Sequence, residues 1–130
     1  MYDKLKQDCI DANLRLPKLD LVFFTFGNVS CADREHGVFA IKPSGVEYDN
    51  LTVEDIVIVG FNGQVIEGKL RPSSDTPTHA VLYREFPELG SIVHTHSRCA
   101  TAWAQACRAI PIYGTTHADH LPCAVPCTKW

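Results

Sequence analysis

Apolar residues in the first half of the chain predict one helix followed by short strands. They recur with near-helical spacing from about Asp3 to Leu16, and Pro17 interrupts this pattern, so we expect an amphipathic helix that ends there. The segments beyond are rich in β-branched and aromatic residues, which is typical of strands. They comprise residues 21–30, residues 37–41, and a hairpin of residues 56–60 and 64–67 around the Asn62-Gly63 turn.

Helical and strand patterns alternate in the second half. We expect a helix over residues 77–86 that stops at Pro87, a strand over 91–95, an alanine-rich helix over 98–109 and a strand over 110–114. This mixture predicts an α/β fold in which helices flank a sheet. No repeat or linker interrupts the 130 residues, so we expect a single domain over residues 1–130.

The amino-acid composition excludes several classes of function. With 45% hydrophobic residues, 21% charged residues and a formal charge of −3, the chain is neither disordered nor basic enough to predict nucleic-acid binding. Its apolar runs are too short to span a bilayer, and its first residues lack the apolar stretch of a signal peptide. We therefore expect a cytoplasmic protein with no membrane partner, whose six cysteines are reduced thiols.

Two histidines predict a metal site. His94 and His96 fall in the expected strand 91–95 and just beyond it, and residues i and i+2 of a strand share a face. Two imidazoles side by side suit zinc or another late first-row divalent ion, and Asp75, just before an expected helix start at Pro77, is a suitable third ligand. The alternative is that each histidine is a hydrogen-bonded polar residue on a half-exposed strand.

Three loops carry small or hydroxyl residues that suit a phosphate. Backbone N–H groups, hydroxyl groups and a helix N-terminus all favour an anion. Each loop by itself is better explained as an ordinary turn. The six residues are Gly27, Asn28, Ser44, Gly45, Ser73 and Ser74.

A carboxylate near the predicted metal ligands suggests a proton-transfer group. Asp119 follows His117 in a segment that we expect to be a loop after the strand 110–114. A carboxylate that lies near a metal without binding it commonly acts as a general acid or base. A helix cap or a surface charge is the alternative.

Taken together, these segments resemble the class II aldolase/epimerase family along almost the whole chain. The matching stretches include Thr25-Phe26-Gly27-Asn28, Pro43-Ser44-Gly45, Pro72-Ser73-Ser74-Asp75 and His94-Thr95-His96, within residues 13–17, 25–30, 41–46, 71–79, 90–97, 114–119 and 126–128. The resemblance implies a three-layer sandwich of a sheet between helices. It also implies a divalent metal, foremost Zn²⁺, on Asp75, His94 and His96, a substrate phosphate on the six loop residues, and an acid/base role for Asp119.

The chemistry that the resemblance implies is epimerisation of a pentulose 5-phosphate. L-ribulose 5-phosphate becomes D-xylulose 5-phosphate by cleavage and re-formation of the C3–C4 bond, and Asp75, where aldolases of the family usually carry Glu, favours this branch. A sugar-phosphate aldolase and a non-catalytic remnant that keeps metal and phosphate binding are the alternatives.

The resemblance also bears on assembly and on the extent of the chain. It implies a homo-oligomer, a tetramer in the family. Family members continue past Trp130 and supply there a third metal histidine and a tyrosine acid/base. We therefore expect the chain to be the N-terminal portion of such a protein, with little or no turnover by itself.

Overall fold

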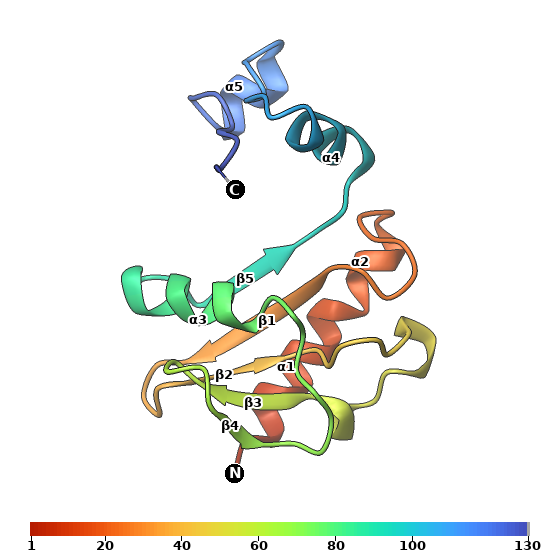
Figure 1. The fold of residues 1–130 in the computed structure, drawn as a ribbon, viewed down its shortest axis with the longest axis vertical. Coiled ribbons are helices and arrows are strands. Elements are labelled where there is room, and N and C mark those ends of the chain that lie inside the picture. Colours follow the sequence, from red (N-terminus) through yellow and green to blue (C-terminus); the bar gives the residue numbers. More distant parts are fainter. Residues whose placement is uncertain (130) are drawn as a thin grey trace. The chain divides into compact units, whose positions relative to one another are not determined.

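The computed structural model describes residues 1–129 and divides the chain into two compact units, Met1–Thr95 and the segment that begins at His96. The first unit contains a five-stranded antiparallel sheet with the strand order β4-β3-β2-β1-β5 (Figure 1). Its helices are α1 (Asp3–Asn13), α2 (Arg15–Lys18) and α3 (Thr76–Glu85). Its strands are β1 (Asn28–Asp33), β2 (Val38–Ile41), β3 (Val57–Gly60), β4 (Val65–Glu67) and β5 (Ser91–His94), with short 3-10 helices at Tyr48–Asn50 and Val53–Asp55.

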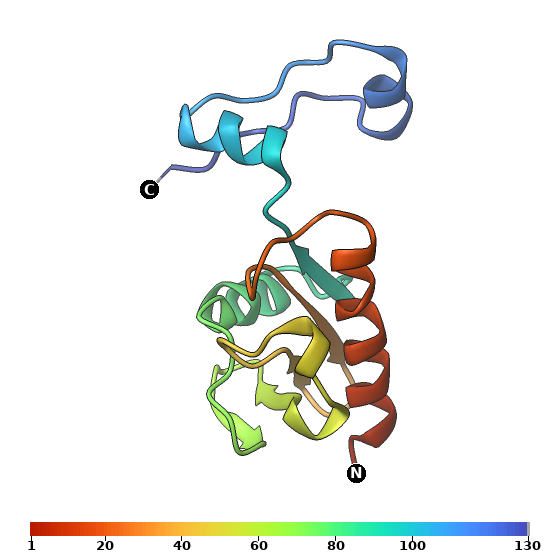
Figure 2. The same cartoon turned by 90° about the vertical axis from the view of Figure 1, so that its right-hand side faces the viewer.

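Helices cover both faces of the sheet. Every residue of β2 and β3 is buried, so side chains on both faces of these strands need a covering layer. Cys9 and Ile10 of α1 pack on one face, and Ala80 and Tyr83 of α3 pack on the other. Figure 2 shows the red helix α1 and the green helix α3 on opposite sides of the strands. The expected arrangement of a sheet between helices is therefore confirmed.

A buried asparagine fixes α1 to the sheet. The Asn13 side chain donates to the carbonyl of Val29 at 2.9 Å and accepts from the Val29 backbone N–H at 2.8 Å. This pair of bonds continues the hydrogen bonding of β1 onto the last residue of the helix, and it satisfies a polar side chain that is fully buried. It therefore holds the start of β1 beside the end of α1.

The helix that we expected over residues 3–16 is in fact two helices. The first ends at Asn13, and Pro17 lies inside the second, α2, rather than beyond a helix end. Within one continuous helix, Pro17 would lack the N–H that bonds to the Asn13 carbonyl, and its ring would clash with that carbonyl. In the first turn of a new helix a missing N–H costs nothing, because those N–H groups have no intrahelical partner.

The strand that we expected over residues 21–30 was wrong for its first seven positions. Residues 21–27 form a loop, and β1 begins only at Asn28. Asp20, Phe24 and Gly27 all have positive φ angles, which an extended strand does not allow, and the Phe26 N–H bonds to the Phe23 carbonyl to close a turn. The segment is therefore not extended, despite the β-propensity of its aromatic residues.

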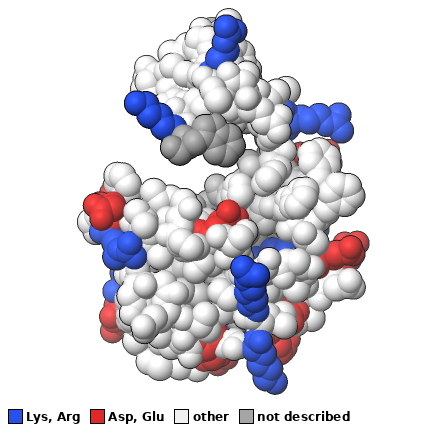
Figure 3. Space-filling model, in the orientation of Figure 1, with Lys and Arg blue, Asp and Glu red and all other residues white. Residues whose placement is uncertain are grey.

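The expected elements of the next segments are present. The hairpin of β3 and β4 turns at Asn62-Gly63, where Gly63 has a φ of 85°, and α3 and β5 lie where the pattern predicted them. Figure 3 shows basic and acidic side chains interspersed over the visible face of the first unit.

The second unit contains α4 (Arg98–Gln105) and α5 (Thr115–His120). The expected helix 98–109 ends early, at Gln105, and the expected strand 110–114 is absent, since Ile110 forms only an isolated bridge with Val125. Among residues 1–129, no helix has the length and apolar character needed to cross a bilayer.

Candidate functional site

Asp75 is directed toward the sheet instead of capping its own helix. It occupies the N-cap position of α3, where an aspartate side chain commonly accepts a hydrogen bond from a backbone N–H, yet the Asp75 side chain makes no such bond. Its Oδ2 atom accepts from Asn28 Nδ2 at 2.7 Å and from Ser73 Oγ at 3.2 Å, and it lies 2.8 Å from His94 Nδ1. Three elements, β1, β5 and the segment before α3, therefore meet at one carboxylate.

The strand register explains why the histidine and the asparagine share this carboxylate. Asn28 on β1 is directly opposite His94 on β5, and side chains of directly opposed residues lie side by side on one face of a sheet. The N-terminus of α3 brings Asp75 to that same face. The arrangement joins residues far apart in sequence.

The surroundings of Asp75 keep it ionised. Partial burial acts to raise its pKa, but the hydrogen bond and the charge interaction with His94 outweigh this, together with hydrogen bonds from Asn28 and Ser73, so its pKa lies below the ordinary value. An ionised carboxylate and an imidazole side by side are two donors of the kinds that zinc accepts. The chemistry of this pair thus fits a divalent metal.

The structure brings the three predicted phosphate loops together. The Ser44 backbone N–H donates to the Arg71 carbonyl at 2.9 Å, and the Ser73 N–H donates to the Lys42 carbonyl at 3.1 Å, with a bridge between Pro43 and Pro72. These bonds place the Ser44-Gly45 loop beside the Ser73-Ser74 loop. The hydrogen bond from Asn28 Nδ2 to Ser73 Oγ, 3.1 Å long, adds the Gly27-Asn28 loop.

Two glycines in these loops have conformations that other residues rarely adopt. Gly27 has a φ of 75° and Gly45 a φ of 74°. At Gly27 an added Cβ would also lie 2.4 Å from Val22 Cγ1 and 2.9 Å from the His94 carbonyl oxygen, so the glycine allows the loop to pack directly against β5. At Gly45 no atom lies within 4 Å of that position, so the loop backbone is open to an incoming ligand.

Two buried oxygens at this site lack a hydrogen-bond partner. Within residues 1–129 the buried side-chain atoms without one are Asn28 Oδ1 and Thr76 Oγ1. Both residues adjoin Asp75, one through a hydrogen bond and the other along the chain. Buried polar atoms are nearly always satisfied, and exceptions frequently mark functional positions. The two oxygens therefore mark the surroundings of Asp75 as a candidate functional position.

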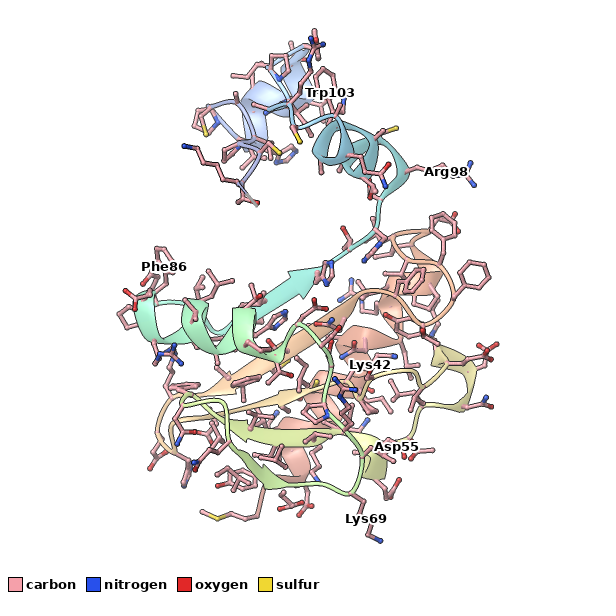
Figure 4. The ribbon with its side chains drawn as sticks, viewed as in Figure 1. Lys42, Asp55, Lys69, Phe86, Arg98 and Trp103 are labelled. Carbon is pink, nitrogen blue, oxygen red and sulfur yellow. The ribbon has the colours of Figure 1, made fainter. Side chains whose placement is uncertain are left out.

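Sequence reasoning missed Lys42, which lies inside the first unit at the end of β2 (Figure 4). Its ammonium group bonds to the carbonyls of Thr25, Pro43 and Val46 and lies 4.9 Å from the centre of the Tyr48 ring. Burial lowers its pKa. The sequence could have indicated this residue, because Lys42 directly follows a strand of apolar residues and lysine is seldom buried unless its charge is paired.

Tyr48 was also missed. Its hydroxyl donates to the carbonyls of Phe26 and Gly27 at 3.1 and 2.9 Å, and its burial raises its pKa to about 12, so it remains a neutral donor. Lys42 and Tyr48 together therefore hold the first two loops by their backbones.

A buried polar network lies beneath Asp75. Ser30 Oγ is 2.7 Å from both His79 Nδ1 and the Tyr83 hydroxyl, which links β1 to α3. Burial lowers the pKa of His79 to about 4, against the opposing influence of Asp75, so its ring is neutral near pH 7. His79 is therefore a buried, neutral member of this network.

His96 and Asp119 belong to the second unit. The expectation that His94 and His96 share one strand was wrong, because β5 ends at His94. The expectation of a loop at Asp119 was also wrong, because this exposed residue lies within α5. Across the part of the chain that the structure describes, no three His, Cys, Asp or Glu side chains gather closely enough to hold a metal. The roles assigned to His96 and Asp119 stay predictions.

Solved structures similar to this chain define the class of fold. An L-fuculose 1-phosphate aldolase superposes with a TM-score of 0.79 and 35% identity, and covers 83% of this chain and 51% of its own. The L-fuculose-1-phosphate aldolase of Thermus thermophilus has a TM-score of 0.75 and 28% identity, and covers 97% of this chain and 63% of its own. The fold is that of the class II aldolases.

The Class II Aldolase and Adducin N-terminal domain family matches residues 7–130, and the chain belongs to this family. The match runs across both units. The L-ribulose-5-phosphate 4-epimerase UlaF of Salmonella paratyphi B is 58% identical over 126 residues, which are 97% of this chain and 55% of that protein; the Salmonella typhi protein gives the same values. The chain thus spans about half the length of the curated relatives that it matches.

Proposed function

We propose that the chain contributes the metal-binding and phosphate-binding part of an L-ribulose-5-phosphate 4-epimerase. The observation that carries the proposal is the Asp75 carboxylate, which accepts hydrogen bonds from Asn28 and Ser73 and lies 2.8 Å from His94 Nδ1. The reaction would convert L-ribulose 5-phosphate to D-xylulose 5-phosphate by cleavage and re-formation of the C3–C4 bond. The 58% identity to an epimerase supports this choice of substrate.

The phosphate would bind where the three loops meet. Backbone N–H groups of the open Gly45 turn and hydroxyl groups of Ser44, Ser73 and Ser74 supply donors, and the N-terminus of α3 adds partial positive charge. The buried Lys42 ammonium contributes a full positive charge beneath the same loops. Held at its phosphate, the aldehyde fragment would stay in place while it rotates between cleavage and re-addition.

The substrate hydroxyl groups would bind beside the carboxylate. Asn28, whose Nδ2 donates to Asp75, holds that carboxylate in place beside them. Asp75, His94 and His96 would hold a divalent metal, foremost Zn²⁺, which supplies Lewis acidity toward the ketose oxygens. Asp119 would move the proton of the C4 hydroxyl. A cytoplasmic location and a homo-oligomeric assembly likewise stay predictions.

A sugar-phosphate aldolase is the second candidate. It is favoured by the similarity of the first solved structure described above, an aldolase at 35% identity. Both reactions cleave a carbon–carbon bond, and they differ in whether the aldehyde fragment is released. Product analysis separates them.

The test uses this chain alone and also joined to the corresponding remainder of the Salmonella epimerase. Each protein is incubated with L-ribulose 5-phosphate and Zn²⁺, and D-xylulose 5-phosphate and free aldehyde are quantified. We expect the joined protein to form D-xylulose 5-phosphate, and its Asp75→Asn variant to lose that activity while the matched Asp33→Asn variant, altered at the far end of β1, keeps it. Release of stoichiometric aldehyde would support the aldolase, and full activity of Asp75→Asn would contradict both.

A further inference from the structure

Two cysteines outside the candidate site lie on neighbouring elements, Cys9 on α1 and Cys31 on β1. Cys9 of α1 is fully buried, and Cys31 of β1 is half-buried. Both belong to one apolar cluster, in which Cys31 packs against the core around Cys9. Cys9 Sγ also donates to the carbonyl of Val29, 3.4 Å away and two residues before Cys31 on the same strand face. The two thiols therefore lie in the same layer, between the helix and the sheet.

We propose that Cys9 and Cys31 are an oxidation site, at which the two thiols close to a disulfide that joins α1 to β1 when the protein meets a peroxide. Neither cysteine takes part in the proposed epimerase chemistry. Asn28 and Ser30, which contact the Asp75 site and its supporting network, point to the opposite face of β1. The oxidation site is thus separate from the candidate functional site, although both use the same strand.

The two thiols have different roles in this reaction. The interaction with the Cys9 side chain lowers the pKa of Cys31, against the effects of partial burial and of the nearby Asp8 carboxylate. The same interaction with Cys31, together with burial, raises the pKa of Cys9 well above its ordinary value. The thiolate is the reactive form of cysteine, so the half-buried Cys31 attacks first.

The chemistry balances with hydrogen peroxide as the oxidant. The Cys31 thiolate attacks one peroxide oxygen, the O–O bond breaks, and Cys31 sulfenic acid and hydroxide form. Cys9 then loses its proton and attacks the Cys31 sulfur, which forms the S–S bond and releases water. Asn13 Nδ2 lies 3.4 Å from Cys9 Sγ and donates to it, so it stabilises the charge that develops on Cys9 in the second step.

Peptide mapping tests the proposal on the whole chain. The reduced protein is treated with hydrogen peroxide, remaining thiols are alkylated in denaturant, and tryptic peptides are analysed by mass spectrometry. Cleavage after Lys6, Arg15, Lys18 and Arg34 places Cys9 in the peptide of residues 7–15 and Cys31 in that of residues 19–34. We expect these two peptides to be linked, with a mass two hydrogen atoms below the sum of the reduced peptides.

Variants assign the two steps. We expect Cys31→Ser to abolish the link and to leave Cys9 open to alkylation, and Cys9→Ala to leave Cys31 as a sulfenic acid that dimedone traps. The matched control Cys99→Ser, altered at an exposed cysteine of the second unit, should keep the link. The proposal is wrong if Cys9 and Cys31 stay fully alkylatable at peroxide concentrations that oxidise Cys99, or if Cys31 is linked to any other cysteine.

Discussion

Replacement of Gly27 by alanine tests whether the first loop is held against β5 as the structure describes. Two costs add at this position. A φ of 75° costs a residue with a side chain about 1–2 kcal/mol. The new Cβ would also lie 2.4 Å from Val22 Cγ1 and 2.9 Å from the His94 carbonyl oxygen, and crowding of this kind costs about 1–3 kcal/mol. We expect Gly27→Ala to lower the free energy of unfolding by about 2–5 kcal/mol.

Two matched variants separate these costs. Gly63 has a φ of 85° in the hairpin turn with no atom within 4 Å of an added Cβ, so Gly63→Ala should cost only the backbone share of about 1–2 kcal/mol. In a Val22→Ala background, the closest clash is gone, so Gly27→Ala should cost less than it does in the parent chain. The coupling between the two sites should amount to about 1 kcal/mol or more.

Amide hydrogen exchange of β2 and β3 is the suitable assay, because these buried strands report the unfolding of the first unit by itself. The reasoning is refuted if Gly27→Ala costs no more than Gly63→Ala, or if the effect of Gly27→Ala is independent of Val22.

Three further predictions concern pH, phosphate and metal. Burial lowers the pKa of His79 from 6.5 in the unfolded chain to about 4 in the folded chain, so its contribution to stability is present above pH 6.5 and is lost as the pH falls toward 4. His79→Gln should remove about 3 kcal/mol of pH dependence from the free energy of unfolding in urea across that window. An unchanged pH profile would contradict the burial of His79. L-ribulose 5-phosphate should raise the melting temperature of the chain more than L-ribulose does, and Ser74→Ala should reduce that difference. An equal rise in melting temperature with the two sugars would contradict the proposed phosphate site. His94→Ala or His96→Ala should weaken Zn²⁺ binding about tenfold or more in calorimetric titration, whereas His36→Ala should not. Equal Zn²⁺ affinities of the three variants would contradict the proposed metal ligands.

The sequence predicted the elements that depend on local signals. The turn at Asn62-Gly63 and the prolines that bracket α3 specify backbone geometry by themselves, and the structure has these elements where they were expected. The segment 21–27 was misread as a strand because its aromatic residues suit a sheet, whereas Phe24 and Gly27 have positive φ angles and Gly27 packs directly against Val22 and the His94 carbonyl. Such tertiary constraints leave no local pattern.

The candidate site was likewise predictable only in part from the sequence. The residue types of Asp75 and His94 could be chosen from the sequence, and the structure brings them together. That Asn28 bonds to the same carboxylate depends on the register of β1 against β5, which spacing along the chain does not reveal. The role of Lys42 was missed for a similar reason, since its partners are backbone carbonyls of loops that meet only in the fold.

The most direct test of the central claim is a titration of the isotope-labelled chain with L-ribulose 5-phosphate, followed through its backbone amide resonances. The account predicts that the largest shifts fall on the three loops that meet beside Asp75, at Gly27, Asn28, Ser44 and Gly45 and at the Ser73-Ser74 pair, and that L-ribulose without phosphate leaves the Ser44-Gly45 and Ser73-Ser74 resonances unmoved. Shifts concentrated elsewhere in the first unit, or the same shifts from both sugars, would contradict it.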